Sequence, residues 1–314
     1  MLRFKKFLLG LLVTALVWVP SGARAKEIVV ATSATVLTNL PYWVAIERKF
    51  FEQAGLTVQY VVMRSDLAVK GLITGDVDYN QSSSSVLRAA AAGAPVVTVA
   101  GIFNRTFFEL VARSDIKSLS DLKGKPVGIS RHGASTEHAL RFGLKANGID
   151  PDRDIKMLAV GGEPARIAGL QSGTLAASVL QVPSNLFAHK LGGHTLLNLG
   201  DYMETLLAGA GTSWRKVEQN REEVKNVIHS LMRAVEFMRE RSSEAKEIIQ
   251  RKLGVDGNVA QSILALVVKY ASRDGIPSRK ALENTLIGTP FEGKSVSFDK
   301  FADFSIAREL AQGK

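Results

Sequence analysis

The sequence predicts an α/β protein with two similar halves and a helical C-terminal layer, and three observations support this prediction. Short β-branched segments alternate with helical segments of about 8–15 residues, which is the pattern of βαβ units in a parallel-rich sheet flanked by helices. The motif GLITG at 71–75 returns as GLQSG at 169–173, each time closing a helix before a strand. Beyond Trp214, the apolar residues repeat at helical spacing.

The first half begins with a strand at 26–32, followed by a helix over 41–54. Pro41 suits the first turn of that helix, and Gly55 suits its C-terminal cap. The alternation then predicts strands at 56–63, 77–80 and 96–100, and helices at 67–74 and 82–92.

The second half resumes the alternation after a turn-rich link at 114–124. It predicts strands at 126–130, 155–160, 176–180 and 194–197, and helices at 134–146, 164–171 and 184–191. An amphipathic helical pattern then runs from Trp214 to Met238, and three further helices are expected near 243–252, 258–272 and 277–286. The C-terminal third is therefore predicted to be a helical layer and not a third α/β unit.

The N-terminus carries the pattern of a cleaved export signal. Basic residues at 3–6 precede an apolar run at 7–19, and Ala23-Arg24-Ala25 is an A-x-A cleavage pattern. The run is too short for a membrane span, which needs about 20 residues. We therefore predict a signal peptide at 1–25, cleavage after Ala25, a periplasmic location and no stable membrane insertion afterwards. Removing the four basic residues of this segment lowers the formal charge from +10 to +6. The remaining basic residues are scattered, so no nucleic-acid partner is indicated.

The chain contains no cysteine, which excludes disulfides, thiolate zinc sites, iron–sulfur clusters, a cysteine nucleophile and a lipid-modified N-terminal cysteine. It has no G-x-G-x-x-G or Walker loop, and its histidines lack the H-E-x-x-H spacing of a zinc site. The segment GISRH at 128–132 approaches the G-x-S-x-G motif of hydrolases, but His132 replaces the final glycine. We therefore expect no catalytic residue, no metal and no cofactor.

Four polar segments are candidates for a ligand site, because loops at the carboxyl ends of parallel strands line the ligand crevice of such sheets. The first segment follows the first strand and offers Thr35, Thr38 and Asn39 as hydrogen-bond donors, with Trp43 as a stacking partner. The alternative is a solvated loop in which Thr38 or Asn39 caps the next helix.

The second segment, Ser82, Ser83 and Ser84, stands at a predicted helix start. Free backbone N–H groups, hydroxyls and the helix dipole together favour an anion there. Helix capping explains one of these serines equally well.

The third segment is the strand-to-helix turn of the second half. Ser135 and Thr136 offer hydroxyls at a helix N-terminus, Arg131 and His132 bring positive charge, and Gly133 allows close approach of the backbone. The alternative is an exposed arginine beside a histidine that caps the turn.

The fourth segment combines Asn104 and Arg105 with Gln181. Arg105 is suited to bind a carboxylate or sulfonate with two parallel hydrogen bonds. A surface arginine is the equal alternative, so the sequence leaves the role of Arg105 open.

Several motifs occur in an order and spacing that resemble one family. Pro41, Ala45, Phe51 and Gly55 match P-x-x-x-A-x-x-x-G-x-F-x-x-x-G, except that Lys49 replaces the internal glycine. Residues 75–78 match G-x-x-D, residues 89–96 match A-x-x-x-G-x-P-V, and residues 118–128 match S-L-x-D-L-K-G-K-x-V-G. A second departure is the pair Ala–Ala at 176–177, where D-A is common. From 26 to 219 the chain resembles the extracytoplasmic solute-binding proteins of ABC importers that include the sulfonate, taurine, nitrate and thiamine-precursor binding proteins.

The resemblance implies the two-lobed periplasmic binding protein fold of type II, whose chain crosses twice between the lobes. The expected crossings are at 109–113 and 206–212, with lobe one at 26–110 and 209–314 and lobe two at 111–208.

The function implied by the resemblance is capture of a small solute by hinge closure and its delivery to a membrane ABC permease, by a monomeric protein that is not an enzyme. Arg105 and Arg131 favour an organic anion such as a sulfonate or carboxylate, whereas stacking on Trp43 would favour a heterocycle. Two alternatives stay open: a solute receptor of a tripartite ion-driven transporter or sensor system, and a periplasmic enzyme. The enzymatic branch of the family uses a cysteine cluster, which this chain lacks.

Overall fold

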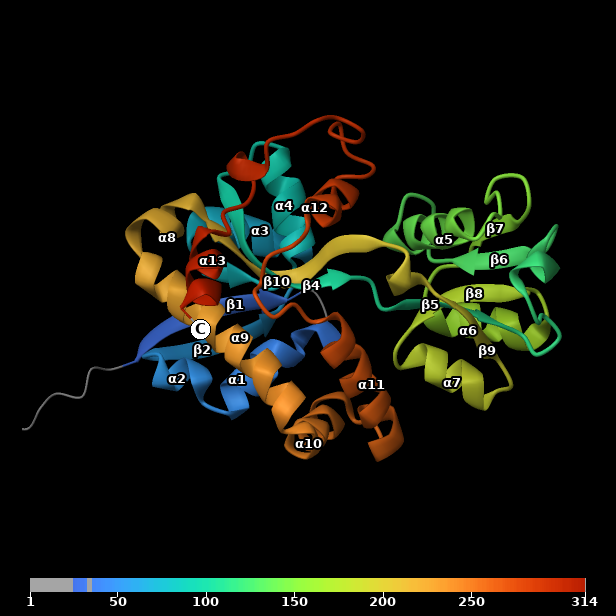
Figure 1. Cartoon of the computed structure of the whole chain (residues 1–314), viewed down its shortest axis with the longest axis horizontal. Coiled ribbons are helices and arrows are strands. Elements are labelled where there is room, and N and C mark those ends of the chain that lie inside the picture. The colour runs from blue at the N-terminus through green and yellow to red at the C-terminus, as the bar shows by residue number, and fades with distance from the viewer. Residues whose placement is uncertain (1–24, 33–35, 314) are drawn as a thin grey trace, which may run out of the picture.

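Two five-stranded sheets, one in each of two lobes, organise the chain in the computed structural model (Figure 1). The structure describes residues 25–32 and 36–313, so residues 1–24 of the predicted signal peptide lie outside the described residues. The strand order in the first lobe is β2 (Leu56–Val62), β1 (Lys26–Thr32), β3 (Tyr79–Asn80), β10 (Glu204–Ser213) and β4 (Val96–Arg105). The order in the second lobe is β7 (Lys156–Ala159), β6 (Pro126–Ile129), β8 (Ala177–Gln181), β5 (Phe108–Ala112) and β9 (His194–Asn198). The predicted two-lobed α/β fold is confirmed.

Each sheet is mixed, because one strand that carries the chain between the lobes runs against its neighbours. β1 pairs in parallel with β2 and β3, and β6 pairs in parallel with β7 and β8. β10 runs antiparallel between β3 and β4, and β5 runs antiparallel between β8 and β9. The sequence predicted β5 and β10 only as connections and not as strands.

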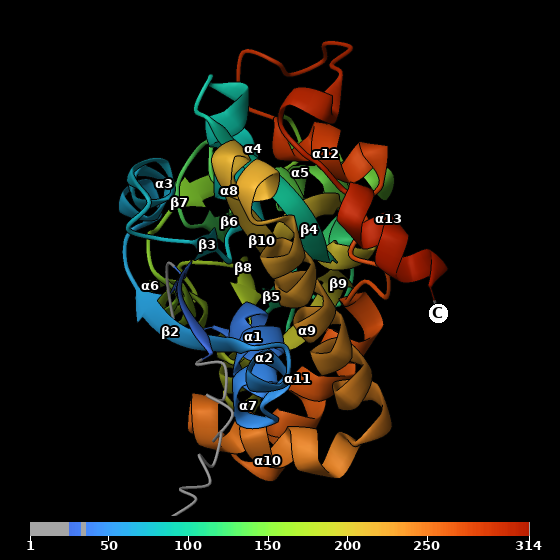
Figure 2. The same cartoon turned by 90° about the vertical axis from the view of Figure 1, so that its left-hand side faces the viewer.

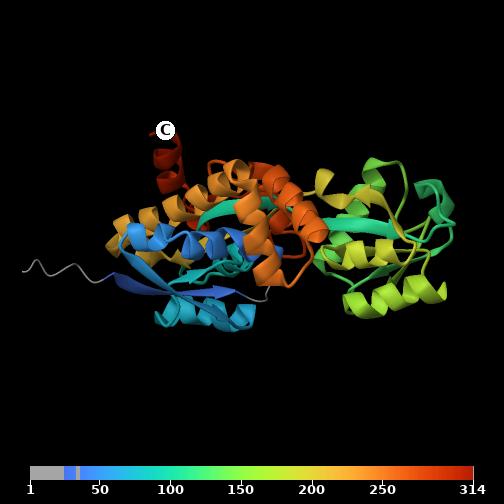
Figure 3. The ribbon, with the colours of Figure 1, turned by 90° about the horizontal axis from the view of Figure 1, so that it is seen from below.

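The two connections between the lobes are short, and Figure 3 shows both passing between the sheets. The first spans the two residues between β4 and β5, and the second runs from β9 through the 3₁₀ turn η3 (Leu199–Asp201) into β10. The predicted lobe limits, at 110/111 and 208/209, fall inside β5 and β10. Because each of these strands pairs within one sheet only, the hydrogen bonds favour limits a few residues earlier in the chain.

Helices cover both faces of the first sheet. Side chains of α3 (Ser65–Thr74) and α4 (Ser83–Ala91) form a small core against one face. The larger core lies on the other side, where the helices are α1 (Leu40–Glu47), α2 (Phe50–Gln53), α9 (Arg221–Glu240), α10 (Ser242–Leu253) and α11 (Gly257–Tyr270). Figure 2 shows this helical layer together with α8 (Trp214–Gln219), α12 (Arg279–Thr285) and α13 (Ser305–Gln312). The sequence did not predict α13. Within 25–32 and 36–313, none of the helices is long and apolar enough to cross a membrane.

The second lobe repeats this arrangement on a smaller scale. α5 (Ser135–Ala146) packs Ala139, Leu140 and Leu144 into the core on one face of the sheet. α6 (Glu163–Ser172) and α7 (Ser184–Lys190) contribute to a separate cluster that includes Ile167 and Ala188.

The repeated glycine motif has the same steric cause in both lobes. Gly75 and Gly173 end α3 and α6 in the left-handed conformation, with φ of 95° and 79°. The first glycine of each motif lies against the residue that leads into the next strand. A Cβ atom on Gly71 would come within 2.6 Å of Val77, and a Cβ atom on Gly169 would come within 2.7 Å of Leu175. The motif therefore marks equivalent positions in the two lobes, as predicted.

The predicted helix over 41–54 is divided at Lys49. Lys49 has a φ of 58° and is the one residue other than glycine with positive φ among the described residues. It separates α1 from α2, at the position where the motif that the sequence resembles has glycine. An L-residue pays about 1–2 kcal/mol in this conformation, whereas glycine adopts it freely.

Replacing Lys49 by glycine should stabilise the protein by about 0.5–1 kcal/mol, because the left-handed conformation is no longer strained. Urea unfolding of the purified protein measures this change. The matched control is Lys70→Gly in the middle of α3, which should destabilise by about 1 kcal/mol. Equal destabilisation by both substitutions would contradict the assignment of strain to Lys49.

A partly buried cluster of charges joins the start of β1 to α8 and α9. The Nζ atom of Lys26 lies 2.5 Å from Glu223, and that of Lys216 lies 3.1 Å from Glu223 and also contacts Asp78. The hydroxyl of Tyr79 donates to Glu223 at 2.9 Å. Burial alone would raise the pKa of Glu223, but the interactions with Lys26, Tyr79 and Lys216 outweigh it and lower the pKa below its ordinary value.

Because the folded-state pKa of Glu223 is lowered, its charge stabilises the protein above the unfolded-state pKa of about 4.3 and this contribution is lost as the pH falls through the folded-state pKa. Glu223→Gln should therefore lower the free energy of unfolding at pH 7 by about 3 kcal/mol. The variant should also lose less stability than the wild type between pH 7 and pH 3. Urea unfolding across this range gives both values, and parallel pH profiles would contradict the prediction.

Candidate functional site

Polar loops follow the carboxyl ends of the parallel strands, where the two lobes face each other. β1 runs toward the second lobe (Figure 3), and β6 runs toward the first lobe (Figure 1). β3 lies parallel beside β1, and β8 lies parallel beside β6. The loops after these four strands therefore lie at the boundary between the lobes, which is the place where sheets of this kind bind ligands.

Gln81 holds the loops of the first lobe together. Its side chain is 3% exposed, donates from Nε2 to the carbonyl oxygen of Thr38 at 3.0 Å and accepts from Thr32 at 3.2 Å. Its own carbonyl oxygen accepts from the N–H of Gly209 in β10. Gln81 was not predicted as a site residue, although it directly precedes the predicted serines.

The first predicted segment is mostly buried. Thr35 lies outside the described residues, and Thr38 is half-buried in a 3₁₀ turn. Asn39 is fully buried and occupies the N-cap position of α1 without a side-chain capping bond. Trp43 is 8% exposed and belongs to the large core of the first lobe. Its indole therefore packs in the core and not at an exposed stacking position, because α1 buries six consecutive residues, Leu40 to Ala45.

The three predicted serines at the start of α4 point in different directions. Ser82 is the N-cap residue, and its hydroxyl pairs with that of Ser85 at 2.9 Å. Ser83 is fully buried and donates to the carbonyl oxygen of Ala100, so the structure gives it a packing role and not the predicted ligand contact. Ser84 is half-buried and makes a long hydrogen bond, 3.4 Å, to the carbonyl oxygen of Leu207.

The turn before α5 is held by two side chains of the helix itself. Thr136 is buried, and its hydroxyl bonds the backbone N–H and the hydroxyl of Ser130, so Thr136 holds the turn rather than meeting a ligand as predicted. Glu137 accepts from the N–H of Gly133 at 2.7 Å. Burial alone would raise the pKa of Glu137, but the bonds from Gly133 and Arg141 lower it, so this carboxylate is charged at neutral pH.

The predicted residues of this turn that remain exposed are Arg131, His132 and Ser135. The Nδ1 atom of His132 lies 3.6 Å from Glu137. Ser135 is the first residue of α5, where backbone N–H groups lack partners within the helix.

Gln181, at the end of β8, is joined to a carboxylate that the sequence analysis missed. Glu163, the first residue of α6, accepts from the backbone N–H of Gln181 at 3.1 Å and from the hydroxyl of Ser184. The buried Arg166 lies 3.6 Å from Glu163. The sequence did contain a signal for Glu163, because this carboxylate directly follows a Gly–Gly pair after a predicted strand. Among the described residues, no group of acidic and histidine side chains is arranged to hold a metal ion.

Arg105 links the two connections between the lobes and is not free to bind an anion as predicted. Its Nη1 atom donates to the carbonyl oxygens of Gly200 and Asp201, at 3.1 and 3.3 Å, and its Nη2 atom pairs with Glu204 at 3.0 Å. Asn104 donates to the carbonyl oxygen of Gly101 within β4. Arg105 therefore acts on the second connection, whereas the bond of Asn104 stays within β4.

A small pocket brings together predicted serines from the two lobes. Ser84 of α4 and Ser135 of α5 line one pocket of about 160 Å³, together with Arg88 and His138. Residues of both connections, among them Thr106 and Met203, also line it. The sequence analysis missed Arg88 and His138, which follow the serines by one helical turn. Burial lowers the pKa of Arg88, but a guanidinium remains charged in proteins.

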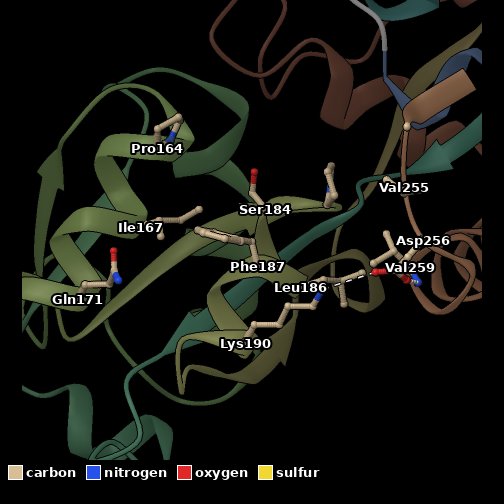
Figure 4. Close-up of a pocket in the computed structure, with 12 residues that line it drawn as sticks. Pro164, Ile167, Gln171, Ser184, Leu186, Phe187, Lys190, Val255, Asp256 and Val259 are labelled. Carbon is tan, nitrogen blue, oxygen red and sulfur yellow. Dashed lines mark hydrogen bonds and ion pairs between the residues drawn. The ribbon is translucent and has the colours of Figure 1, made fainter. Parts of the chain in front are cut away.

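A larger pocket of about 540 Å³ opens on the other side of the connections (Figure 4). Its walls are α6, α7 and the loop with Pro183 in the second lobe, and residues 254–259 of the first lobe. An ion pair between Lys190 and Asp256, 3.5 Å apart, joins the two walls.

A comparison with protein families identifies the chain. The family model described as NMT1/THI5 like matches residues 38–245, which is more than half of the sequence. The chain belongs to the NMT1/THI5-like family. The predicted family resemblance is thereby confirmed. A curated Brucella abortus protein described as a binding protein is 25% identical over 257 residues, which cover 77% of each chain.

Solved structures share the fold of this NMT1/THI5-like protein at low sequence identity. The periplasmic sulfonate-binding protein SsuA from Methylobacillus flagellatus has a TM-score of 0.71 and 16% identity, covering 92% of this chain and 95% of its own. The nitrate-binding protein NrtA from Synechocystis has a TM-score of 0.65 and 15% identity, covering 92% and 89%. A mutant of DszB in complex with biphenyl-2-sulfinic acid has a TM-score of 0.68 and 14% identity, covering 92% and 100%.

Arg105→Ala should loosen the second connection without removing a ligand contact. Amide hydrogen exchange over 199–203 should become at least several-fold faster, because the carbonyl oxygens of Gly200 and Asp201 lose their donor. The free energy of unfolding should fall by about 1 kcal/mol, since the arginine is partly exposed. Unchanged hydrogen exchange together with a selective loss of anion binding would show instead that Arg105 binds the ligand.

Proposed function

We propose that this protein is the periplasmic solute-binding component of an ABC importer and captures a small organic anion between its two lobes. The observation that carries this proposal is the pocket shared by Ser84 and Ser135, since it takes one hydroxyl from the first turn of a helix in each lobe. A solute held there contacts both lobes at once.

The charge of this pocket favours an anion. Its titratable side chains are Arg88 and His138, and none of the described residues that line it is acidic. The N-terminal turns of α4 and α5 add backbone N–H groups and the positive ends of two helix dipoles. The pocket is smaller than the 300–1,000 Å³ typical of drug-sized ligands. We infer that it receives the anionic group of the solute, a sulfonate or a carboxylate.

The related proteins support import as the role. SsuA and NrtA are described as periplasmic sulfonate-binding and nitrate-binding proteins. An anion that binds the closed arrangement of the lobes better than the open one shifts the population toward closure. The closed monomer then delivers the anion to its membrane permease. The predicted signal peptide, which lies outside the described residues, provides export.

The alternatives make different demands on the protein. A receptor of an ion-driven transporter or a sensor would bind the same anions and differ only in its membrane partner. A periplasmic enzyme would convert the anion instead of retaining it, so mass spectrometry of a stoichiometric mixture distinguishes it. A heterocyclic ligand loses one argument, because Trp43 is buried in the core.

Removing either pocket hydroxyl should weaken anion binding. In isothermal titration calorimetry with methanesulfonate, acetate and nitrate, we expect at least one of these anions to bind. Ser84→Ala and Ser135→Ala should each lower its affinity about tenfold, because each loses one hydrogen bond to a charged group. At 100 times its dissociation constant, the bound anion should stabilise the fold by about 2.7 kcal/mol.

The matched control is Ser120→Ala, which removes an exposed hydroxyl of the second lobe that lines neither pocket. It should leave the affinity for the anion unchanged. Binding of no anion by the wild type, or equal effects of all three substitutions, would contradict the proposed function.

A further inference from the structure

The small pocket between the lobes holds a basic side chain from each lobe, in matching positions. In α4, Arg88 follows Ser84 by four residues. In α5, His138 follows Ser135 by three residues. Side chains at these spacings lie on the same face of a helix, and all four line the pocket. Each lobe therefore presents a hydroxyl and, one turn further along the helix, a side chain that can carry positive charge.

The two basic side chains lie against adjacent residues of one turn in the first lobe. The carbonyl oxygen of Ile287, just beyond α12, accepts a hydrogen bond from the Nη2 atom of Arg88 at 3.1 Å. A Cβ atom on the next residue, Gly288, would lie 4.0 Å from the Nε2 atom of His138. Figure 1 shows α12 between α4 and α5, so this turn spans the space between the two helices. The guanidinium and the imidazole thus flank one short segment of backbone.

Neither basic side chain is neutralised by a carboxylate. Among the described residues, the guanidinium of Arg88 forms no ion pair, and the imidazole of His138 has neither a hydrogen-bond partner nor an ion-pair partner. None of the described residues that line the pocket is acidic. By contrast, the imidazole of His189 in α7 shares a hydrogen bond with the hydroxyl of Thr195. An anion in the pocket therefore meets an unpaired imidazole.

Carboxylates do occur on the elements that pack against α5 or line the pocket with it, but each has a partner there. They are Glu137 of α5 with Arg141, Asp201 of η3 with Lys269, Glu109 of β5 with Thr195, Glu204 of β10 with Arg105, Glu283 of α12 with Arg279, and Glu292 beyond α12 with the N–H of Gly288. Of these, Glu292 binds the residue beside the imidazole. It is exposed, so solvent and salt screen its charge.

We propose that anion binding in this pocket is coupled to protonation of His138, so that the protein binds its solute more tightly as the pH falls. The inference rests on the proposed function, because it concerns the same pocket. A histidine side chain gains its positive charge within the range of about pH 8 to pH 5. In the charged ring both nitrogens donate hydrogen bonds, whereas the neutral ring has one donor and one acceptor. An anion therefore binds the charged ring better, while Arg88 attracts it at every pH because a guanidinium stays charged.

Isothermal titration calorimetry of the purified protein at pH 6 and pH 8.5 measures this coupling. Methanesulfonate, acetate and nitrate all stay ionised over this range, so a change in affinity comes from the protein. We expect the anion that binds to do so about fivefold more tightly at pH 6 than at pH 8.5, because the charged imidazole adds one charge-assisted hydrogen bond. At pH 7, heats measured in buffers of different ionisation enthalpy should show that binding takes up part of a proton.

His138→Asn should remove both effects. Its affinity at pH 6 should fall to the value at pH 8.5, and binding should take up no proton. The matched control is His189→Asn, which removes an imidazole that does not line the pocket and should retain the pH dependence. Arg88→Gln should weaken binding at both pH values and also retain the pH dependence, since it removes a charge that does not titrate.

The outcomes distinguish this inference from the proposed function. If an anion binds with equal affinity at both pH values and without proton uptake, the coupling is refuted and the proposed function stands. A pH dependence that persists in His138→Asn would show that another group takes up the proton, which also overturns the inference. If the wild type binds none of the three anions, both proposals fail. The proton uptake of the wild type tests the coupling independently of how well any variant folds.

Discussion

The close approach of β10 to its neighbours is the constraint on which the rest of the structure depends. A Cβ atom on Gly209 would lie 2.1 Å from the carbonyl oxygen of Ala100, and one on Gly211 would lie 2.6 Å from Val86 of α4. Only glycine fits at these two points, since real contacts of Cβ atoms are longer. This packing inserts β10 between β3 and β4, and the same strand receives the chain from the second lobe. The position of the second lobe is therefore set by a strand inside the first sheet.

The second connection is held from both lobes, which makes it a defined hinge and not a free linker. Leu199 packs into the core of the second lobe, whereas the neighbouring Asp201 is bound by Lys269 and Tyr270 of α11 in the first lobe. Burial alone would raise the pKa of Asp201, but these two partners lower it, so the anchor is charged at neutral pH. Together with the bonds from Arg105, this anchor fixes the second connection to the first lobe.

Local sequence signals predicted most of the helices and strands. They did not predict the parts of the structure that depend on contacts between residues far apart in the sequence. Gly55, Gly75 and Gly173 indicated where helices end. The alternation of strands and helices predicted both α/β units. β10 was missed because its residues, ETLLAGAGTS, are largely small and gain their strand conformation from pairing with β3 and β4. Among the residues that line the small pocket, Ser84 and Ser135 were predicted, because each lies in a polar segment that follows a strand. Arg88 and His138 were not, since the exposed face of a helix does not indicate which residues of another element it will contact. Trp43 shows the converse difficulty, because a tryptophan in the first turn of a helix that follows a polar loop fits either a core or a site.

The order of the strands also bears on how the protein is made. All strands of the second sheet lie between residues 108 and 198, an uninterrupted stretch of chain, whereas the first sheet waits for β10 at 204–213 to fill its interior. Every strand of the second lobe therefore precedes, in the chain, the strand that completes the first. Domains fold as units as they emerge, and pairings between distant segments form slowly. The second lobe begins later in the sequence, but its sheet can form before the sheet of the first lobe is complete. The strand β10 then pairs between β3 and β4.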